Sequence, residues 1–246
     1  MGTPTPTIND PSHKVVGVLL AAGSSRRFGS ANKLLATYNH QPMMFHALDC
    51  LLESDLEHLI VVLGCDSEHL EQASRAHLEK AHTNKYKTVH FLKNQEHETG
   101  MASSLRLAVS TLMQDPINLD ISDAPPAHPK YASIRPPAAL IYLADMPQVQ
   151  PETLNTLISG LAIATTTQPT AVNPPVVSAL VPTYQGKRGN PVLLLSDLFD
   201  SVVELTGDIG ARQLLKTIPD KVQEIPVDDP GIFTDYDTPD QLSESQ

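Results

Sequence analysis

The sequence predicts an α/β fold in which a mostly parallel sheet is covered by helices on both faces. Apolar runs of strand length recur along the chain, beginning with Val15–Ala21, and segments with apolar residues at helical spacing lie between them. Strands that are apolar at every position are typical of parallel sheets whose two faces are buried. Their alternation with amphipathic helices indicates βαβ units.

The elements are clearest in the first half of the chain. Apolar runs predict strands at Val15–Ala21, His58–Leu63, 88–92 and Ala138–Leu143. Residues 42–53 and 101–113 place apolar side chains on one helical face. Later segments are more mixed and predict strands at 176–181, Val192–Leu195 and 222–227, and helices at 153–164 and 210–216.

The domain organisation follows from length and proline content. The 246 residues suit one large α/β domain or two small ones. We expect a disordered tail at 1–13 and a single domain over 14–246. Residues 115–137 contain six prolines and no periodic face, and 165–175 are also proline-bearing. A long loop of this kind is either functional or a surface insertion, and insertion is the preferred interpretation for 115–137.

Composition excludes several classes of protein. The net charge of −11 argues against nucleic acid as a partner, because a basic surface normally dominates such binding. No run reaches the roughly 18 apolar residues of a membrane span. A signal peptide at 14–23 is disfavoured by its thin basic region and the polar tail ahead of it. Cys50 and Cys65 lack metal-ligand spacing, so we expect buried thiols and a cytoplasmic protein.

The strongest functional pattern follows the first strand. Its residues are Leu20, Ala21, Ala22, Gly23, Ser25, Arg27 and, shortly after, Lys33. A strand that runs into a Gly/Ser-rich turn exposes backbone N–H groups that bind phosphate, and the two basic side chains add full charges. The pattern is neither GxxxxGK[ST] nor GxGxxG. The alternative is a solvated turn with surface arginines.

Two further segments are candidate parts of the same site. Asp145 lies just beyond a predicted strand, at the edge where open α/β sheets bind ligands, and a carboxylate there is a suitable Mg²⁺ ligand. Capping of the following helix is its alternative role. Gly100, Ser103 and Ser104 open a helix whose free N–H groups would bind an anion, or Thr99 or the serines simply cap that helix.

Histidines offer no comparable constellation. His69, His77 and His82 have spacings that share no ligand face, and we expect a solvated helix surface.

The ordered motifs resemble a known family. LAAGxSxRxG with a following Lys is similar to the nucleotide-binding loop of nucleotidyltransferases with a GT-A-like, Rossmann-like α/β fold. Later segments match in order: Gly100-Met-Ala-Ser-Ser-Leu105, Leu143-Ala-Asp-Met-Pro147, Arg188-Gly-Asn-Pro-Val192, Thr206-Gly-Asp-Ile-Gly-Ala-Arg212 and Asp235-Tyr-Asp-Thr-Pro239. Over about residues 15–242, the chain resembles the molybdenum cofactor cytidylyltransferases.

The resemblance implies a reaction and roles for residues. The terminal phosphate of molybdopterin would attack the α-phosphorus of CTP and release pyrophosphate. Mg²⁺ would be held by Asp145 and Asp237, with Asp235 as a lesser candidate, while Arg27 and Lys33 neutralise the triphosphate. Asp237-Thr-Pro also reads as a helix start, with Thr238 as cap and Pro239 as first residue.

Substrate selection follows from the same resemblance. It places Arg188, Asn190, Asp208 and Arg212 on the pterin side. Asp208 could instead cap a helix, and Arg212 could be a surface residue. The family more often has His at the position of Asn190, which leaves the role of this residue open. Related guanylyltransferases read LAGG, so the Ala22 methyl group is a steric reason to expect CTP. A molybdoenzyme that receives the cofactor is a candidate partner.

Two alternatives remain open. One is a sister transferase acting on another small phosphate, such as a sugar phosphate. The other is a non-catalytic factor that delivers the finished cofactor. A carrier has no need of a triphosphate and metal site, which argues against the second.

Overall fold

The computed structural model describes residues 15–23, 28, 32–56, 58–80, 88–114, 138–166 and 177–243. The predicted tail at 1–13, the proline-rich insertion at 115–137 and most of 165–175 lie outside these residues. The domain boundaries therefore stay a prediction. Within the described ranges, no helix is both long and apolar enough to cross a membrane.

The main sheet has the order β10-β7-β9-β6-β1-β4-β5, with β8 paired to β7. Its strands are β1 Val15–Ala21, β4 His58–Leu63, β5 Thr88–Lys93, β6 Ala138–Leu143, β7 Ala179–Tyr184, β8 Lys187–Arg188, β9 Val192–Leu195 and β10 Val222–Pro226. A separate antiparallel ribbon joins β2 Thr37–Tyr38 to β3 Gln41–Pro42. Strands β6, β1, β4 and β5 are parallel neighbours, and β7 pairs in parallel with β10. The predicted α/β fold with a mostly parallel sheet is confirmed.

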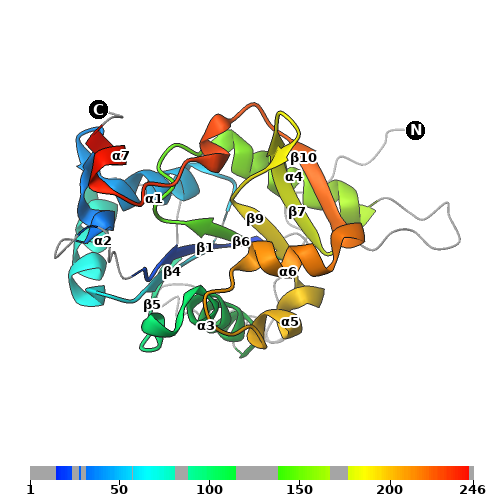
Figure 1. The fold of residues 1–246 in the computed structure, drawn as a ribbon, viewed down its shortest axis with the longest axis horizontal. Coiled ribbons are helices and arrows are strands. Elements are labelled where there is room, and N and C mark those ends of the chain that lie inside the picture. Colours follow the sequence, from blue (N-terminus) through cyan, green and yellow to red (C-terminus); the bar gives the residue numbers. More distant parts are fainter. Residues whose placement is uncertain are drawn as a thin grey trace, which may run out of the picture.

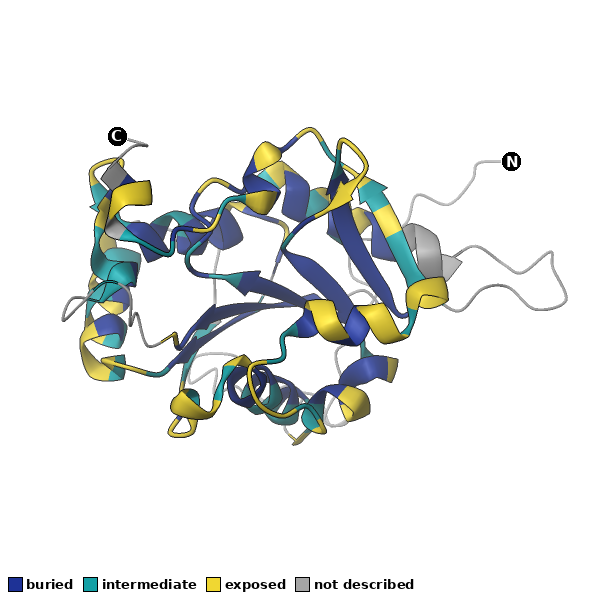
Figure 2. Cartoon of the chain, in the orientation of Figure 1, coloured by how far each residue is buried: buried dark blue, intermediate teal, exposed yellow. Residues whose placement is uncertain are grey.

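Helices cover both faces of this sheet (Figure 1). They are α1 Met43–Glu53, α2 Ser67–Lys80, α3 Met101–Gln114, α4 Pro151–Thr166, α5 Phe199–Val203, α6 Ala211–Thr217 and α7 Pro239–Ser243. Strand β1 shows why two layers form, because its side chains alternate between two cores. Leu19 packs with residues of α1 and α4, whereas Val18 packs with residues of α3, α5 and α6. The central strands are buried almost throughout, and exposed residues gather on the outer helices and β10 (Figure 2).

Strand β9 departs from the parallel rule, since it pairs antiparallel with both β6 and β7. Its connection to β7 spans only residues 185–191 and includes β8. A parallel neighbour needs a crossover of a dozen or more residues, so this short connection imposes the reversed direction.

Three details of the sequence-based expectations need correction. The strand predicted at 176–181 is Ala179–Tyr184, because pairing with β10 continues through Thr183 despite the less apolar residues there. Cys65 is exposed rather than buried, while Cys50 is buried as expected. The His77 side chain is only 18% exposed, because it stacks on Phe45 and pairs with a carboxylate of α1.

The order of the strands locates a ligand site. The chain passes from β1 to β4 and β5 and then returns to β6 on the other side of β1. Open α/β sheets bind ligands at the carboxyl ends of the strands where this reversal occurs. The residues that follow β1 and β6 at this edge are Ala22 and Ala144, and Asp145 comes next.

Candidate active site

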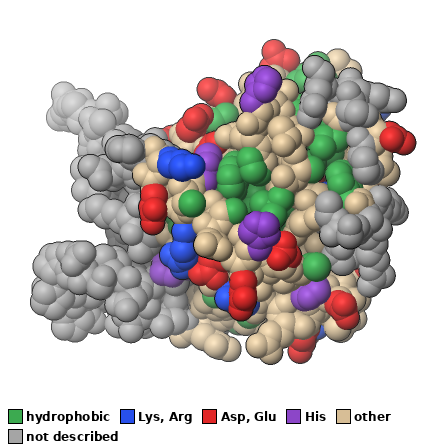
Figure 3. All heavy atoms as spheres, turned by 90° about the vertical axis from the view of Figure 1, so that its left-hand side faces the viewer, with side chains coloured by type: hydrophobic (Ala, Val, Ile, Leu, Met, Phe, Trp, Pro, Cys, Tyr) green, Lys and Arg blue, Asp and Glu red, His purple; other side chains and the backbone are tan. Residues whose placement is uncertain are grey.

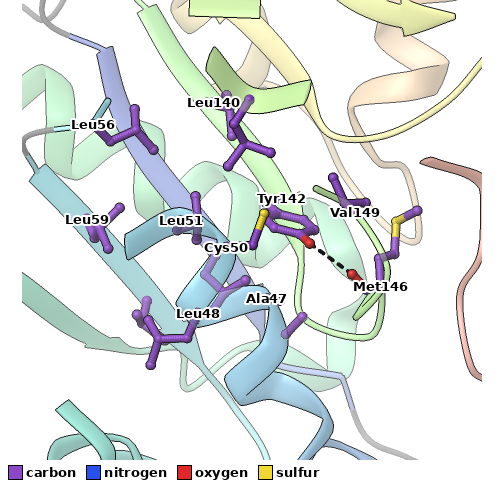
Figure 4. Close-up of a cluster of buried hydrophobic side chains, with 14 of the residues drawn as sticks. Ala47, Leu48, Cys50, Leu51, Leu56, Leu59, Leu140, Tyr142, Met146 and Val149 are labelled. Atoms are coloured by element: carbon purple, nitrogen blue, oxygen red, sulfur yellow. Dashed lines mark hydrogen bonds between the residues drawn. The ribbon is translucent and has the colours of Figure 1, made fainter. Parts of the chain in front are cut away.

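Asp145 is held in a tight loop at the end of β6. The Ala144 N–H donates to the Leu20 carbonyl, which ties the loop to β1. The hydroxyl of Tyr142, a fully buried residue, donates to the Met146 carbonyl at 2.9 Å, as the close-up in Figure 4 shows. The backbone on both sides of Asp145 is therefore fixed by the core. A capping role at α4 is not seen, because the Asp145 side chain instead contacts Lys33.

Lys33 begins a short 3₁₀ helix, Lys33–Leu35, that follows the loop predicted to bind nucleotide. The Asn32 side chain caps this turn by accepting from the Leu34 N–H at 3.0 Å. Leu34 is buried in the core beside α1 and so anchors the turn. The cap and this anchor aim the Lys33 side chain at the carboxyl edge of the sheet.

Asp237 arrives on the C-terminal segment, which is anchored at Asp229. That buried carboxylate accepts hydrogen bonds from the Gln150 N–H, the Thr153 hydroxyl and the Gly231 N–H. A β-carbon on Gly231 would lie 2.4 Å from the Gln148 carbonyl oxygen, so only glycine permits this close approach. The segment is thereby tied to the loop that follows β6.

The helix start predicted next to Asp237 is confirmed. Helix α7 begins at Pro239. The Gln241 side chain accepts from the N–H groups of Asp237 and Thr238 at 2.8 and 3.0 Å, and the Thr238 hydroxyl accepts from the Gln241 N–H at 3.4 Å. This is a capping box, and Asp237 takes part in it through its backbone N–H, while its carboxylate contacts Lys33.

Lys33 lies between the two carboxylates. Its ammonium is 2.6 Å from Asp145 Oδ2 and 2.9 Å from Asp237 Oδ1. The Lys33 and Asp145 side chains are 11% and 20% exposed, and that of Asp237 is 41% exposed. Burial alone would lower the pKa of Lys33, but the charges and hydrogen bonds of the two carboxylates outweigh it and raise this pKa above its ordinary value. Asp235 is exposed and makes no ion pair with Lys33.

The carboxylate pair fits a divalent cation. Asp145 Oδ1 is buried and has no hydrogen-bond partner among the described residues, although its sister oxygen contacts Lys33. An unpaired buried carboxylate oxygen is costly unless a ligand satisfies it. No cluster of three or more His, Cys, Asp or Glu suited to a metal occurs within the described ranges. Two carboxylates match Mg²⁺, which binds through one or two carboxylates together with substrate phosphates.

The loop that is predicted to bind nucleotide is described in part. Leu20, Ala21 and Ala22 are buried, whereas Gly23 is exposed with open space where a β-carbon would lie. Ala22 packs against Gly64, whose own β-carbon would lie 2.6 Å from the Ala22 carbonyl oxygen. The Ala22 methyl group thus has a packing role here, and its effect on nucleotide choice stays a prediction. Ser25 and Arg27 lie outside the described residues.

The start of α3 has partners within the protein. The Met101 N–H donates to Asp208 Oδ1 at 3.3 Å, and the Ala102 N–H donates to the Gly207 carbonyl. A β-carbon on Gly100 would lie 2.4 Å from that same carbonyl oxygen. Asp208 therefore caps α3, from which it is far removed in the chain. The sequence instead predicts that Thr99 or the serines cap α3 and that Asp208 caps α6.

Ser103 and Ser104 are buried beneath this helix start. Both hydroxyls accept from the Asn94 amide, at 2.8 and 2.9 Å. Nucleotide contact by Gly100, Ser103 and Ser104 stays a prediction.

The residues assigned to the pterin side lie on separate elements. Arg188 pairs with Glu224 on the exposed surface at 2.7 Å. The Asn190 N–H donates to the Ile232 carbonyl, which places this turn against the C-terminal segment. Arg212 is exposed on α6. Their role in binding the acceptor stays a prediction.

Sequence reasoning missed the residues that hold the carboxylates together. The first is Asp229, which accepts a hydrogen bond from the Gln150 N–H. The second is Gln148, whose side-chain amide bonds to the hydroxyl groups of Tyr38 and Tyr236. Spacing carries no signal for such contacts, because they join segments far apart in the chain.

On the face that carries α2 and α7, charge is dispersed. Seen from the side of α2 and α7, acidic, basic and histidine side chains of the described residues are interspersed around a small apolar patch (Figure 3).

Comparisons with known proteins identify the family of the chain. The family model of the MobA-like NTP transferase domain matches residues 17–223. The nicotine blue oxidoreductase of Paenarthrobacter nicotinovorans is 26% identical over 93% of this chain and 94% of its own. The purine catabolism protein PucB of Bacillus subtilis (strain 168) is 28% identical over 92% and 93%.

Solved structures share the fold. Rv0371c of Mycobacterium tuberculosis H37Rv has a TM-score of 0.65 at 25% identity, covering 94% of this chain and 97% of its own. A nucleotidyl transferase from Methanothermobacter has a TM-score of 0.63 at 15% identity, covering 95% and 99%. Nucleotidyltransferases of this kind generally use a divalent metal ion, and Rv0371c has also been solved in complex with manganese. The resemblance found in the sequence is therefore confirmed, and the chain belongs to the MobA-like NTP transferase family and is a nucleotidyltransferase.

Proposed function

We propose that the protein transfers a cytidylyl group from CTP to the terminal phosphate of molybdopterin. The observation that carries the proposal is the position of Lys33 between Asp145 and Asp237, beside a buried carboxylate oxygen that lacks a partner. These groups converge where the nucleotide loop ends and the sheet reverses its strand order. The motif order along the chain supports the pterin branch of the family.

The chemistry follows from charge and position. An oxygen of the molybdopterin phosphate forms a bond to the α-phosphorus of CTP, the bond from that phosphorus to the bridging oxygen breaks, and pyrophosphate leaves with the electron pair. The nucleophile is already an anion, so no general base is required. A Mg²⁺ ion on Asp145 and Asp237 would supply charge neutralisation at the phosphates. Lys33, with Arg27 from the nucleotide loop, would neutralise the departing pyrophosphate.

Pyrophosphate release tests the proposal. The protein is incubated with MgCl₂ and each of the four ribonucleoside triphosphates, with and without molybdopterin. We expect release only with CTP and molybdopterin together. Equal use of GTP would remove the cytidylyl assignment, and release with a sugar phosphate in place of the pterin would identify a sister transferase.

A matched pair of variants tests the site itself. Asp145→Asn keeps the size of the side chain but removes its charge, and we expect a rate lower by about 100-fold or more. Asp220→Asn, on an exposed turn, serves as the control and should leave the rate unchanged. An unimpaired Asp145→Asn variant would refute the metal assignment.

A further assay addresses the carrier alternative. A pull-down with an apo-molybdoenzyme tests delivery of the cofactor, and a complex formed without any turnover would favour the carrier.

A further inference from the structure

One side-chain amide joins two buried tyrosines beside the active site. Gln148 Nε2 donates to the Tyr38 hydroxyl at 2.9 Å and to the Tyr236 hydroxyl at 2.8 Å. The two rings lie 5.2 Å apart and are 4% and 3% exposed. Both protons of the amide are therefore used, and the exposed Gln148 side chain bonds to the hydroxyl ends of two otherwise buried tyrosines.

Each member of this cluster lies close in sequence to one of the charged site residues. Gln148 follows Asp145 on the loop after β6, and Tyr236 immediately precedes Asp237. Tyr38 lies in β2, on the segment that begins with Lys33. The amide thus joins the three stretches of chain that bring the two carboxylates and the ammonium together.

The backbone repeats the connection between two of these stretches. The Tyr236 N–H donates to the Asp145 carbonyl at 3.1 Å. This bond ties the main chain beside one carboxylate to the main chain beside the other. The Tyr236 hydroxyl, at the far end of its ring, provides a second point of attachment through Gln148.

We propose that Gln148 is a positioning residue that, through Tyr38 and Tyr236, holds Asp145 and Asp237 close enough to share one cation. Lys33 pairs with both carboxylates, but the chain segments that carry them are joined by other contacts. The clamp formed by Gln148, Tyr38 and Tyr236 joins these segments before a divalent cation arrives, so less ordering is needed on binding. This inference rests on the proposed function in one respect, because the shared cation is the metal ion of the proposed transferase site.

The test measures Mn²⁺ binding without nucleotide, by electron paramagnetic resonance of the free ion. Gln148→Leu removes both hydrogen bonds at similar volume, and we expect affinity to fall by about 10- to 100-fold, as is common when a residue that orients metal ligands is lost. Gln150→Leu is the matched control, because Gln150 is exposed and uses its backbone N–H, which the substitution retains. Urea unfolding without metal shows whether Gln148→Leu is folded under the conditions of the binding assay.

A second variant covers the case in which Gln148→Leu folds poorly. Tyr38→Phe with Tyr236→Phe keeps both rings and removes both acceptors. We expect it to lower Mn²⁺ affinity like Gln148→Leu, and we expect the triple variant to lose little more, because all three changes break one interaction.

The outcomes separate the clamp from the proposed function. Wild-type affinity for Mn²⁺ in Gln148→Leu and in the double tyrosine variant would overturn the clamp and leave the transferase proposal intact. No Mn²⁺ binding by the wild-type protein, with or without CTP, would overturn the cation site itself. Losses that add independently in the triple variant would also overturn the clamp.

Discussion

Replacing Lys33 by Met removes the ammonium but keeps the length of the side chain. The substitution leaves Asp145 and Asp237 facing each other without the cation that now touches both at 2.6 and 2.9 Å. Breaking a fully buried pair costs about 3–5 kcal/mol and an exposed pair about 0–1 kcal/mol. Asp145 is 20% and Asp237 41% exposed, so we expect the free energy of unfolding to fall by about 2 kcal/mol, between these limits.

The same variant should respond more strongly to metal. A divalent ion neutralises the carboxylates that Lys33 neutralises, so its binding without nucleotide should be tighter in Lys33→Met than in the wild type. Ligand binding to the folded state raises stability by mass action, and MgCl₂ should therefore restore much of the loss. Urea unfolding with and without MgCl₂ measures both effects, and Lys216→Met, on the exposed surface of α6, is the control. An unchanged stability without metal, or an equal gain from MgCl₂ in variant and wild type, would refute the reasoning.

Two further predictions concern groups away from the cation. Burial raises the pKa of Cys50 to about 12 from its ordinary value of 9.0, whereas Cys65 is exposed. A thiol reagent at pH 8 should therefore label one cysteine in the folded protein and two in denaturant. As the pH rises, the Cys50 thiol loses its proton in the unfolded state before it does so in the folded state. The free energy of unfolding should therefore decline from about pH 9 towards pH 12, which alkaline unfolding curves would show. Asp229→Ala leaves three donors without an acceptor, and we expect urea unfolding to show a loss of about 3–5 kcal/mol. Asp228→Ala, at an exposed position, should show almost none.

Much of the fold could be predicted from the chain because the buried strands are marked by uninterrupted apolar runs. The bounds of β1, β4 and β6 agree with those runs, and helices α1 and α3 agree within a residue at each end. The antiparallel β9 was not foreseen, since its direction depends on the length of a connection and not on its own apolar residues.

The candidate site was foreseen in its charges but not in its supports. Lys33, Asp145 and Asp237 belong to three separate motifs of the sequence, and the structure brings them into contact. Gln148 and Asp229, which contact the segments that carry them, are polar residues in loops. Their partners are set by how loops meet at the sheet edge, and a pattern along the chain carries no record of that.

Asp208 shows the same limit. Its position before a helix suggested a cap on that helix, yet it caps α3, whose first residue is Met101. Local rules identify a residue able to accept a backbone N–H. They do not identify which helix end the tertiary fold brings within reach.

The wide separation of the charged residues bears on synthesis of the protein in the cell. Lys33 meets Asp145 across 112 positions and Asp237 across 204. A growing chain on the ribosome can assemble most of the sheet while residue 237 is still inside the exit tunnel, but its cation site stays incomplete until that residue emerges. The proposed cation site therefore forms only after Asp237 has left the ribosome, and a chain cut short before Asp237 would lack one of the two carboxylates.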